Sequence, residues 1–310
     1  MKMKSLFSPT KHNQQLPNRQ MSEEIKNIEQ EEPSFLKVIV HSFFIIPFLI
    51  TVFCALLFGS IYLLTKENKT AQDYLNDVKI GGLTKRWQAA FELSKILSNK
   101  KLLPKKDQFY EELLKAFQDS THDDPRVRQY LALAMGKTER KEYTEPLISA
   151  LKEEKEENLP ALIYGLGMLK DEGAIEPLSL FMEHTNPKIR SLAAVAIGNT
   201  GSSKARNILK KGLTDSEANV QWGSAIGLAR MGDDAGREIL GKLLTREYLS
   251  QFESIDSEEA TNLVLAAVEA ANHLESQELT QKILRLSQSD KNMTVRSEAL
   301  NYLSRHPSTP

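Results

Sequence analysis

Four ten-residue segments decide how this chain folds, and they align without a gap. They are VRQYLALAMG (127–136), NLPALIYGLG (158–167), IRSLAAVAIG (189–198) and VQWGSAIGLA (220–229). Their first residues are 31 apart each time. A second motif, PLxxxL or ILxxxL, keeps the same period and begins at Pro146, Pro177, Ile208 and Ile239. A period shared by two separate motifs indicates tandem copies of one structural unit.

Each unit is typical of a pair of helices. The PLxxxL motif predicts a short helix with proline near its start, where it costs no hydrogen bond. The ten-residue motif predicts a second helix whose small side chains let neighbouring helices approach closely. We expect Gly136, Gly167 and Gly198 to form left-handed caps at its end. One such hairpin cannot bury its own apolar face, so several must stack.

Looser copies flank the four. KRWQAAFELSKIL begins at 85, 42 residues before Val127, and NLVLAAVEAA begins at 262, 42 residues after Val220. An insertion around 245–257 separates the latter copy from its neighbour, and VRSEALNYL from 295 ends the array. The sequence therefore predicts an all-α fold, an α-solenoid of about seven helical hairpins or part-hairpins from Asp73 to His306.

The pattern VRxxAAxALG after a PLxxxL helix resembles the short HEAT-like repeats of phycobilin-lyase-type proteins and of many bacterial adaptors. IRSLAAVAIGNTG (189–201) carries it best, and the resemblance covers roughly residues 79–305. It departs at Leu159 and Gln221, which replace the arginine, and at Ala229, which replaces the final glycine. The resemblance implies a solenoid, and it implies either a binding scaffold or a lyase or chaperone for a chromophore.

An uncharged apolar run, SFFIIPFLITVFCALLFGSIYLL, covers residues 42–64 and contains the single cysteine, Cys54. A bilayer core needs about 20 apolar residues in a helix, so the run predicts one transmembrane helix. We expect a disordered tail over 1–34, with Met1 or Met21 as the start, and the membrane segment over 35–65. A linker over 66–78, the solenoid over 79–306 and a tail over 307–310 follow.

The residues after the apolar run are basic. Ten lysines and arginines against four acidic residues lie between Lys66 and Lys106. Basic flanks stay in the cytoplasm, which favours a single-pass protein of the inner or plasma membrane with a cytoplasmic solenoid. A start at Met1 adds basic residues to the tail and nearly removes this bias. The candidate membrane-proximal patch consists of Lys85, Arg86, Lys95, Lys100, Lys101, Lys105 and Lys106.

No residues are spaced for catalysis. The six histidines lack metal-ligand spacing, and no G-x-S-x-G, H-E-x-x-H or phosphate-binding glycine loop occurs. The cluster from His122 to Asp124 could be functional, but a helix-capping turn before Pro125 is the favoured interpretation. A net charge of −1 argues against a nucleic-acid binder. We therefore predict no catalytic residue, metal, cofactor or small-molecule substrate, and a protein partner instead.

Arginine recurs at one repeat position, as Arg128, Arg190 and Arg296. These side chains could form a basic ladder for an acidic partner. Alternatively, they pair with carboxylates of neighbouring units, which is the interpretation we favour because arginine is well suited to bidentate ion pairs.

One face of the ten-residue helix is apolar although it points away from the core. If the first residue of each segment is position 0, positions +2, +3 and +6 lie on that face because a helix turns 100° per residue. The face is expected to line the concave surface as a protein-binding groove, unless tight curvature buries it. The candidate groove residues are Trp87, Phe91, Tyr130, Leu133, Tyr164, Leu192, Val195, Trp222 and Ile226.

These features predict a membrane-tethered adaptor that holds a protein partner on its solenoid. A second hypothesis is a structural subunit of a membrane complex, in which the membrane helix docks through the small residues Ala55, Gly59 and Ser60. The third is the lyase or chaperone that the family resemblance implies.

Overall fold

The computed structural model describes residue 39, residues 41–65 and residues 69–306, and the chain divides into two compact units, residues 1–68 and 69–310. In the first unit, a π-helical turn η2 (His41–Ile45) leads into α3 (Ile46–Thr65). Ser42–Leu63 is long and apolar enough to cross a membrane, judged by length and composition alone. The expected tails over 1–34 and 307–310 lie outside the described residues.

The second unit is a solenoid, and its described part contains helices and no strand. Seven helical pairs follow one another, as expected. They are α4 (Ala71–Ile80) and α5 (Leu83–Ile96); α6 (Asp107–Asp119) and α7 (Pro125–Lys137); α8 (Thr144–Leu151) and α9 (Leu159–Leu169); α10 (Ile175–Ser179), extended by η7 (Leu180–Glu183), and α11 (Pro187–Asn199); α12 (Arg206–Gly212) and α13 (Ala218–Arg230); α14 (Arg237–Leu243) and α16 (Ser257–Ala271); and α17 (Gln277–Ser289) and α18 (Met293–Arg305). The short helix α15 (Arg246–Leu249) lies in the insertion between α14 and α16.

The solenoid begins before the domain boundary expected at residue 79 and close to Asp73, where the first hairpin was expected. Helix α4 occupies most of the expected linker over 66–78, and its side chains Ala71, Leu75 and Val78 are buried in the core. Thr70 and Asp73 form a capping box at its start. The boundary was misplaced because α4 lacks the repeat motif and is recognisable only by its cap and its apolar spacing.

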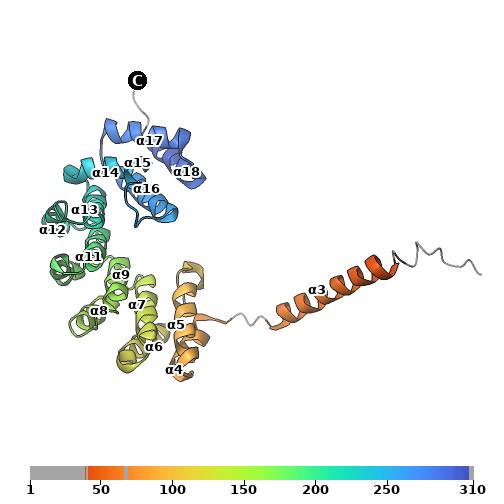
Figure 1. Cartoon of the computed structure of the whole chain (residues 1–310). Helices are drawn as coiled ribbons and strands as arrows, with labels where there is room; N and C mark the ends of the chain where they lie inside the picture. The colour runs from red at the N-terminus through yellow and green to blue at the C-terminus, as the bar shows by residue number, and fades with distance from the viewer. Residues whose placement is uncertain (1–38, 40, 66–68, 307–310) are drawn as a thin grey trace, which may run out of the picture. The chain divides into compact units, whose positions relative to one another are not determined.

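The helices of the solenoid form two curved layers (Figure 1). The second helices of the pairs make up the inner layer, and each contacts the next directly. They are α5, α7, α9, α11, α13, α16 and α18. The first helices form the outer layer. Between the layers, the leucine of the PLxxxL motif is fully buried in every copy, as Leu147, Leu178, Leu209 and Leu240. The repeat pattern therefore fixes both the layers and the core.

The inner helices approach one another at glycines. A Cβ added to Gly198 would lie 2.7 Å from the Cα of Gly227, and one added to Gly136 would lie 2.7 Å from the carbonyl oxygen of Gly165. The expectation of left-handed caps at Gly136, Gly167 and Gly198 is wrong, because all three lie inside their helices. Their role is to allow backbone to pack against backbone.

The left-handed residues come three positions later, at +12 of every gapless copy. They are Glu139 (φ 57°), Lys170 (φ 52°), Gly201 (φ 63°) and Gly232 (φ 70°). This residue turns the chain from the inner helix into the next outer helix. A side chain with a Cβ is strained in this region, so the two copies without glycine carry a local cost.

Gly198→Ala should destabilise the solenoid by about 1–3 kcal/mol, because the new methyl group must push apart two backbones. Urea unfolding of the full chain in detergent, followed by circular dichroism, would measure this. Gly82→Ala is the control, since a Cβ at Gly82 meets nothing within 4 Å. Equal stability of the two variants would contradict the close-packing argument.

Lys170→Gly should stabilise the solenoid by about 0.5–1 kcal/mol, because glycine relieves the left-handed strain and offsets its own entropy cost. Gly201→Ala should destabilise it by about 1 kcal/mol, although the space around Gly201 is open. The same unfolding experiment tests both variants. The opposite sign for either substitution would show that +12 does not impose a left-handed conformation in solution.

Candidate functional site: the inner face of the solenoid

The candidate site is the inner face, defined here as positions +2, +3, +6 and +10 of α5, α7, α9, α11 and α13. A turn of 100° per residue places these four positions within an arc of about 100° on each helix. Six of the predicted groove residues form one apolar stripe across four neighbouring helices. The inner stripe consists of Phe91, Tyr130, Leu133, Tyr164, Leu192 and Val195.

The inner stripe is partly packed and partly open. Tyr164 is 49% exposed, Phe91 37% and Val195 36%. The Phe91 and Tyr130 rings meet edge to face at 5.2 Å, while the other side of Tyr130 packs on the core. Trp87 is half-buried beneath the Arg126 guanidinium, which lies 4.3 Å from its ring. Curvature therefore buries part of each side chain without closing the surface.

Trp222 and Ile226 do not line an open groove, contrary to the prediction. Trp222 is 1% exposed and Ile226 8%. The insertion after α14 covers this part of the inner face, with the Phe252 ring 4.9 Å from Trp222 and the Trp222 Nε1 donating to the Tyr248 hydroxyl at 3.1 Å. The sequence showed the insertion, but nothing in it showed that these aromatic residues fold back onto Trp222.

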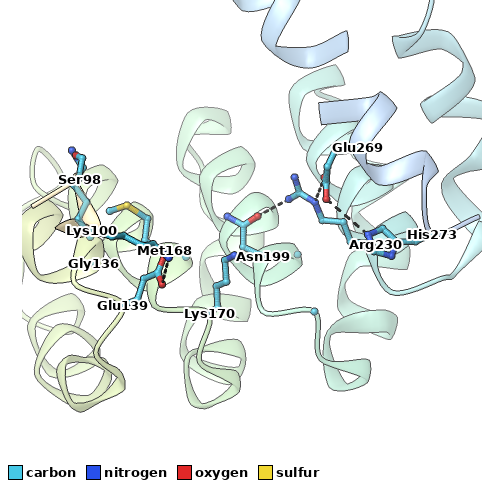
Figure 2. Close-up of a pocket in the computed structure, with 14 residues that line it drawn as sticks. Ser98, Lys100, Gly136, Glu139, Met168, Lys170, Asn199, Arg230, Glu269 and His273 are labelled. Carbon is cyan, nitrogen blue, oxygen red and sulfur yellow. Dashed lines mark hydrogen bonds and ion pairs between the residues drawn. The ribbon is translucent and has the colours of Figure 1, made fainter. Parts of the chain in front are cut away.

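A pocket of about 570 Å³ lies where the inner helices end. Its lining comes from residues at +9, +10 and +12 of successive repeats and from Lys100, Glu269 and His273. Figure 2 shows the Arg230 side chain between Asn199 and Glu269. Its Nη1 donates to the Asn199 Oδ1 at 2.7 Å, and its Nε donates to the Glu269 Oε2 at 2.8 Å. Sequence reasoning missed this pocket, although the repeat positions that line it can be read from the same alignment.

The charged groups of the pocket are unevenly paired. Lys100 pairs with Glu139 at 2.8 Å, and Arg230 pairs with Glu269. Lys137 is half-buried, and within the described residues its ammonium has no ion pair or side-chain hydrogen bond. Burial lowers the pKa of Lys137 below its usual value, which is the direction expected for a cation without a partner.

The arginine ladder is internal, and the favoured interpretation is confirmed at Arg128 and Arg190. Arg128 pairs with Glu154 and donates to the Phe117 carbonyl at 2.8 Å. Arg190 makes two hydrogen bonds of 2.9 Å to Asp215 in the next unit.

The same interpretation extends to the first copy but not to the last. Arg86 occupies the equivalent position and pairs with Asp123. At the last copy, Arg296 donates to the Asp290 carbonyl at 2.6 Å. Arg86, Arg128 and Arg190 therefore join neighbouring units, whereas Arg296 bonds within its own pair, because Asp290 lies between α17 and α18.

The basic patch separates into paired and unpaired residues. Arg86 is engaged in the ladder, Lys85 contacts Asp77 at 2.7 Å and Lys95 contacts Glu92 at 3.1 Å. Lys101, Lys105 and Lys106 are exposed in the loop between α5 and α6, and no ion pair joins them to another described residue. Of the candidate basic patch, only these three lysines are both exposed and unpaired within the described residues.

The cluster at His122 caps a helix, as favoured. The Asp124 side chain accepts from the Arg126 backbone N–H at 3.0 Å at the start of α7. Across 39–65 and 69–306 no group of three or more histidine, cysteine, aspartate or glutamate side chains is placed to hold a metal ion.

Comparison with known proteins identifies the repeats. A family model for HEAT repeats matches residues 175–250. The complex of CpcE and CpcF of phycocyanin lyase from Nostoc sp. PCC7120 is 18% identical, with a TM-score of 0.58 over 78% of this chain and 90% of that one. Among curated proteins, none matches this sequence.

Two further solved structures are more distant. An archaeal HEAT-like repeats protein from Thermococcus onnurineus NA1 is 14% identical over 77% of this chain and 97% of that one, with a TM-score of 0.39. Human deoxyhypusine hydroxylase is 16% identical over 75% and 88%, with a TM-score of 0.34.

The fold and its inner face place the chain in the class of α-solenoids. More particularly, it is a solenoid of HEAT-like repeats with an apolar helix near its N-terminus.

Asp215→Asn should lower the free energy of unfolding by about 2 kcal/mol at pH 7, because a charge-assisted pair between side chains only 14% exposed is lost. The hydrogen bond from Arg190 lowers the pKa of Asp215 below its ordinary 3.8. A carboxylate with a lowered pKa stabilises the fold above its unfolded pKa and loses this effect as the pH falls. The difference between wild type and variant should therefore shrink below about pH 4.

Urea unfolding between pH 7 and pH 3 tests this. Glu172→Gln is the control, because Glu172 forms an exposed pair with Lys204 and should change stability little at any pH. A difference for Asp215→Asn that stays constant across the titration would contradict the assigned pair.

Proposed function

We propose that this protein is a membrane-anchored scaffold whose solenoid binds a segment of a partner protein on its inner face. The open inner stripe carries the proposal. Tyr164, Phe91 and Val195 expose apolar surface in a row, and aromatic side chains are frequent anchors of protein interfaces. At α13 the chain covers the same face with its own Tyr248 and Phe252, which supports a role for this face in receiving protein side chains.

The anchor is the apolar run over 42–64, in which Ser42–Leu63 suffices in length and composition to span a bilayer. We place the solenoid on the cytoplasmic side of the inner or plasma membrane. Lys101, Lys105 and Lys106 support this orientation, since they are exposed and no described residue pairs with them. Such a loop favours anionic lipid headgroups. A membrane anchor would raise the local concentration of the inner face for partners at the same membrane.

Binding is favoured here over catalysis. The likeness to phycocyanin lyase is one of fold, at 18% identity, and the inner face offers apolar and basic side chains. The rival hypothesis is a structural subunit of a membrane complex that docks through its membrane helix. Under that hypothesis, partner capture depends on the membrane helix and not on the inner face.

The expected result is partner crosslinking from the inner face and not from the outer layer. A photoreactive phenylalanine analogue is placed at Tyr164 in the full chain in membranes, and a second protein carries it at Leu180. Leu180 is 74% exposed on the outer η7, so it is the matched control. Tyr164 should give discrete crosslinked bands that a Phe91→Asp substitution removes.

Two outcomes would contradict the scaffold proposal. Equal crosslinking from both positions would mean that the inner face has no special role. Bands that persist with Phe91→Asp but disappear when α3 is replaced by an unrelated membrane helix would favour docking through the membrane helix. Circular dichroism of each variant establishes that the solenoid is folded.

A further inference from the structure

The insertion after α14 is an internal example of what binds the inner face. Tyr248 and Phe252 are four residues apart and both rings meet Trp222, at 6.1 Å and 4.9 Å. Between them, Leu249 at the end of α15 is buried to 1% exposure. Helix α15 ends at Leu249 and Phe252 lies just after the turn that follows it, so a short turn with two aromatic residues fits around Trp222.

The open and covered parts of the inner face can be compared at position +6. Ile226 lies at position +6 of α13 and is 8% exposed, whereas Tyr164 and Val195 at the same position of α9 and α11 are 49% and 36% exposed. Ile226 belongs to the core cluster that joins α13 to α14, α16 and the insertion, whereas Tyr164 and Val195 belong to no such cluster. The apolar surface at position +6 of α9 and α11 is thus left uncovered by any described segment.

Charge adds a second requirement. Four basic and two acidic side chains line the pocket beside the stripe, and both carboxylates already pair with Lys100 and Arg230. Lys137 and Lys170 have no carboxylate partner among the described residues. Lysine near a helix C-terminus interacts favourably with the helix dipole, but that does not compensate the burial of Lys137. The remaining charge at this edge is positive.

Building on the scaffold function, we propose that the inner face from α5 to α11 binds a short segment of a partner protein with two aromatic side chains four residues apart and acidic side chains that pair with Lys137 and Lys170. The insertion itself has this composition. It carries Glu247, Glu253 and Asp256 beside its aromatic residues, and its one basic side chain, Arg246, is bound to Asp290 at 2.9 Å.

The test is selection from a displayed library of random peptides, each as long as the insertion, on the full chain in detergent. The selected peptides should combine paired aromatic residues with an excess of aspartate and glutamate. For one such peptide, Lys137→Gln should weaken binding about tenfold. Its amide version, with Asn and Gln in place of the acids, should change less than about twofold with that substitution. Lys188→Gln on α11 is the control, since Lys188 is exposed and lacks an ion pair in the described part.

Selection on Tyr164→Asp separates this inference from the scaffold function. Peptides that need Tyr164 but show no acidic excess, or that respond equally to Lys137→Gln in acid and amide form, would overturn the acidic-segment proposal and leave the scaffold intact. Peptides that bind Tyr164→Asp as well as wild type would overturn both proposals. Failure to select any peptide would overturn this inference alone, because crosslinking at Tyr164 judges the scaffold separately.

Discussion

The solenoid depends on the direct contact of glycine backbones between successive inner helices. At Gly198 and Gly227 an added Cβ would lie only 2.7 Å from the opposing Cα. The outer helices have no comparable run of glycines, so the inner layer is closer-spaced and the array curves. Because the curvature arises from backbone contact and packed interiors resist volume changes, it is a fixed property of the inner face. A surface with fixed curvature can be complementary to a partner segment without first being ordered.

Side chains at the ends of the helices hold this geometry in register. At three of the units an arginine at position +1 connects to a carboxylate of the next unit, as Arg190 does with Asp215 through two hydrogen bonds. The left-handed residue at +12 fixes the turn into the following outer helix. The arginine contacts and the left-handed turns lie at opposite ends of the inner helices, because position +1 lies at the start of the helix and position +12 follows its end. Together they limit rotation between repeats, and so they preserve the alignment of the inner stripe from α5 to α11.

Much of the fold could be predicted from the sequence because a 31-residue period is visible in two motifs at once. The period predicts the number of pairs, the layers and the rows of the inner face. Predictions failed where a residue acts outside its repeat. Gly198 resembled a cap because its partner, Gly227, belongs to another helix. Trp222 seemed exposed because the segment that covers it occurs once and follows no period. The domain boundary was placed at 79, inside α4, for the same reason, since that helix carries no repeat motif.

The single insertion changes how the inner face should be understood. Without residues 244–256, the aromatic and apolar surface would continue across α13, and Trp222 would be its largest exposed member. With the insertion in place, the surface ends between α11 and α13, where Tyr248 and Phe252 pack on Trp222. The array is therefore longer than the surface it leaves open. The length of that open surface is set by where the chain occupies its own inner face and not by the number of repeats.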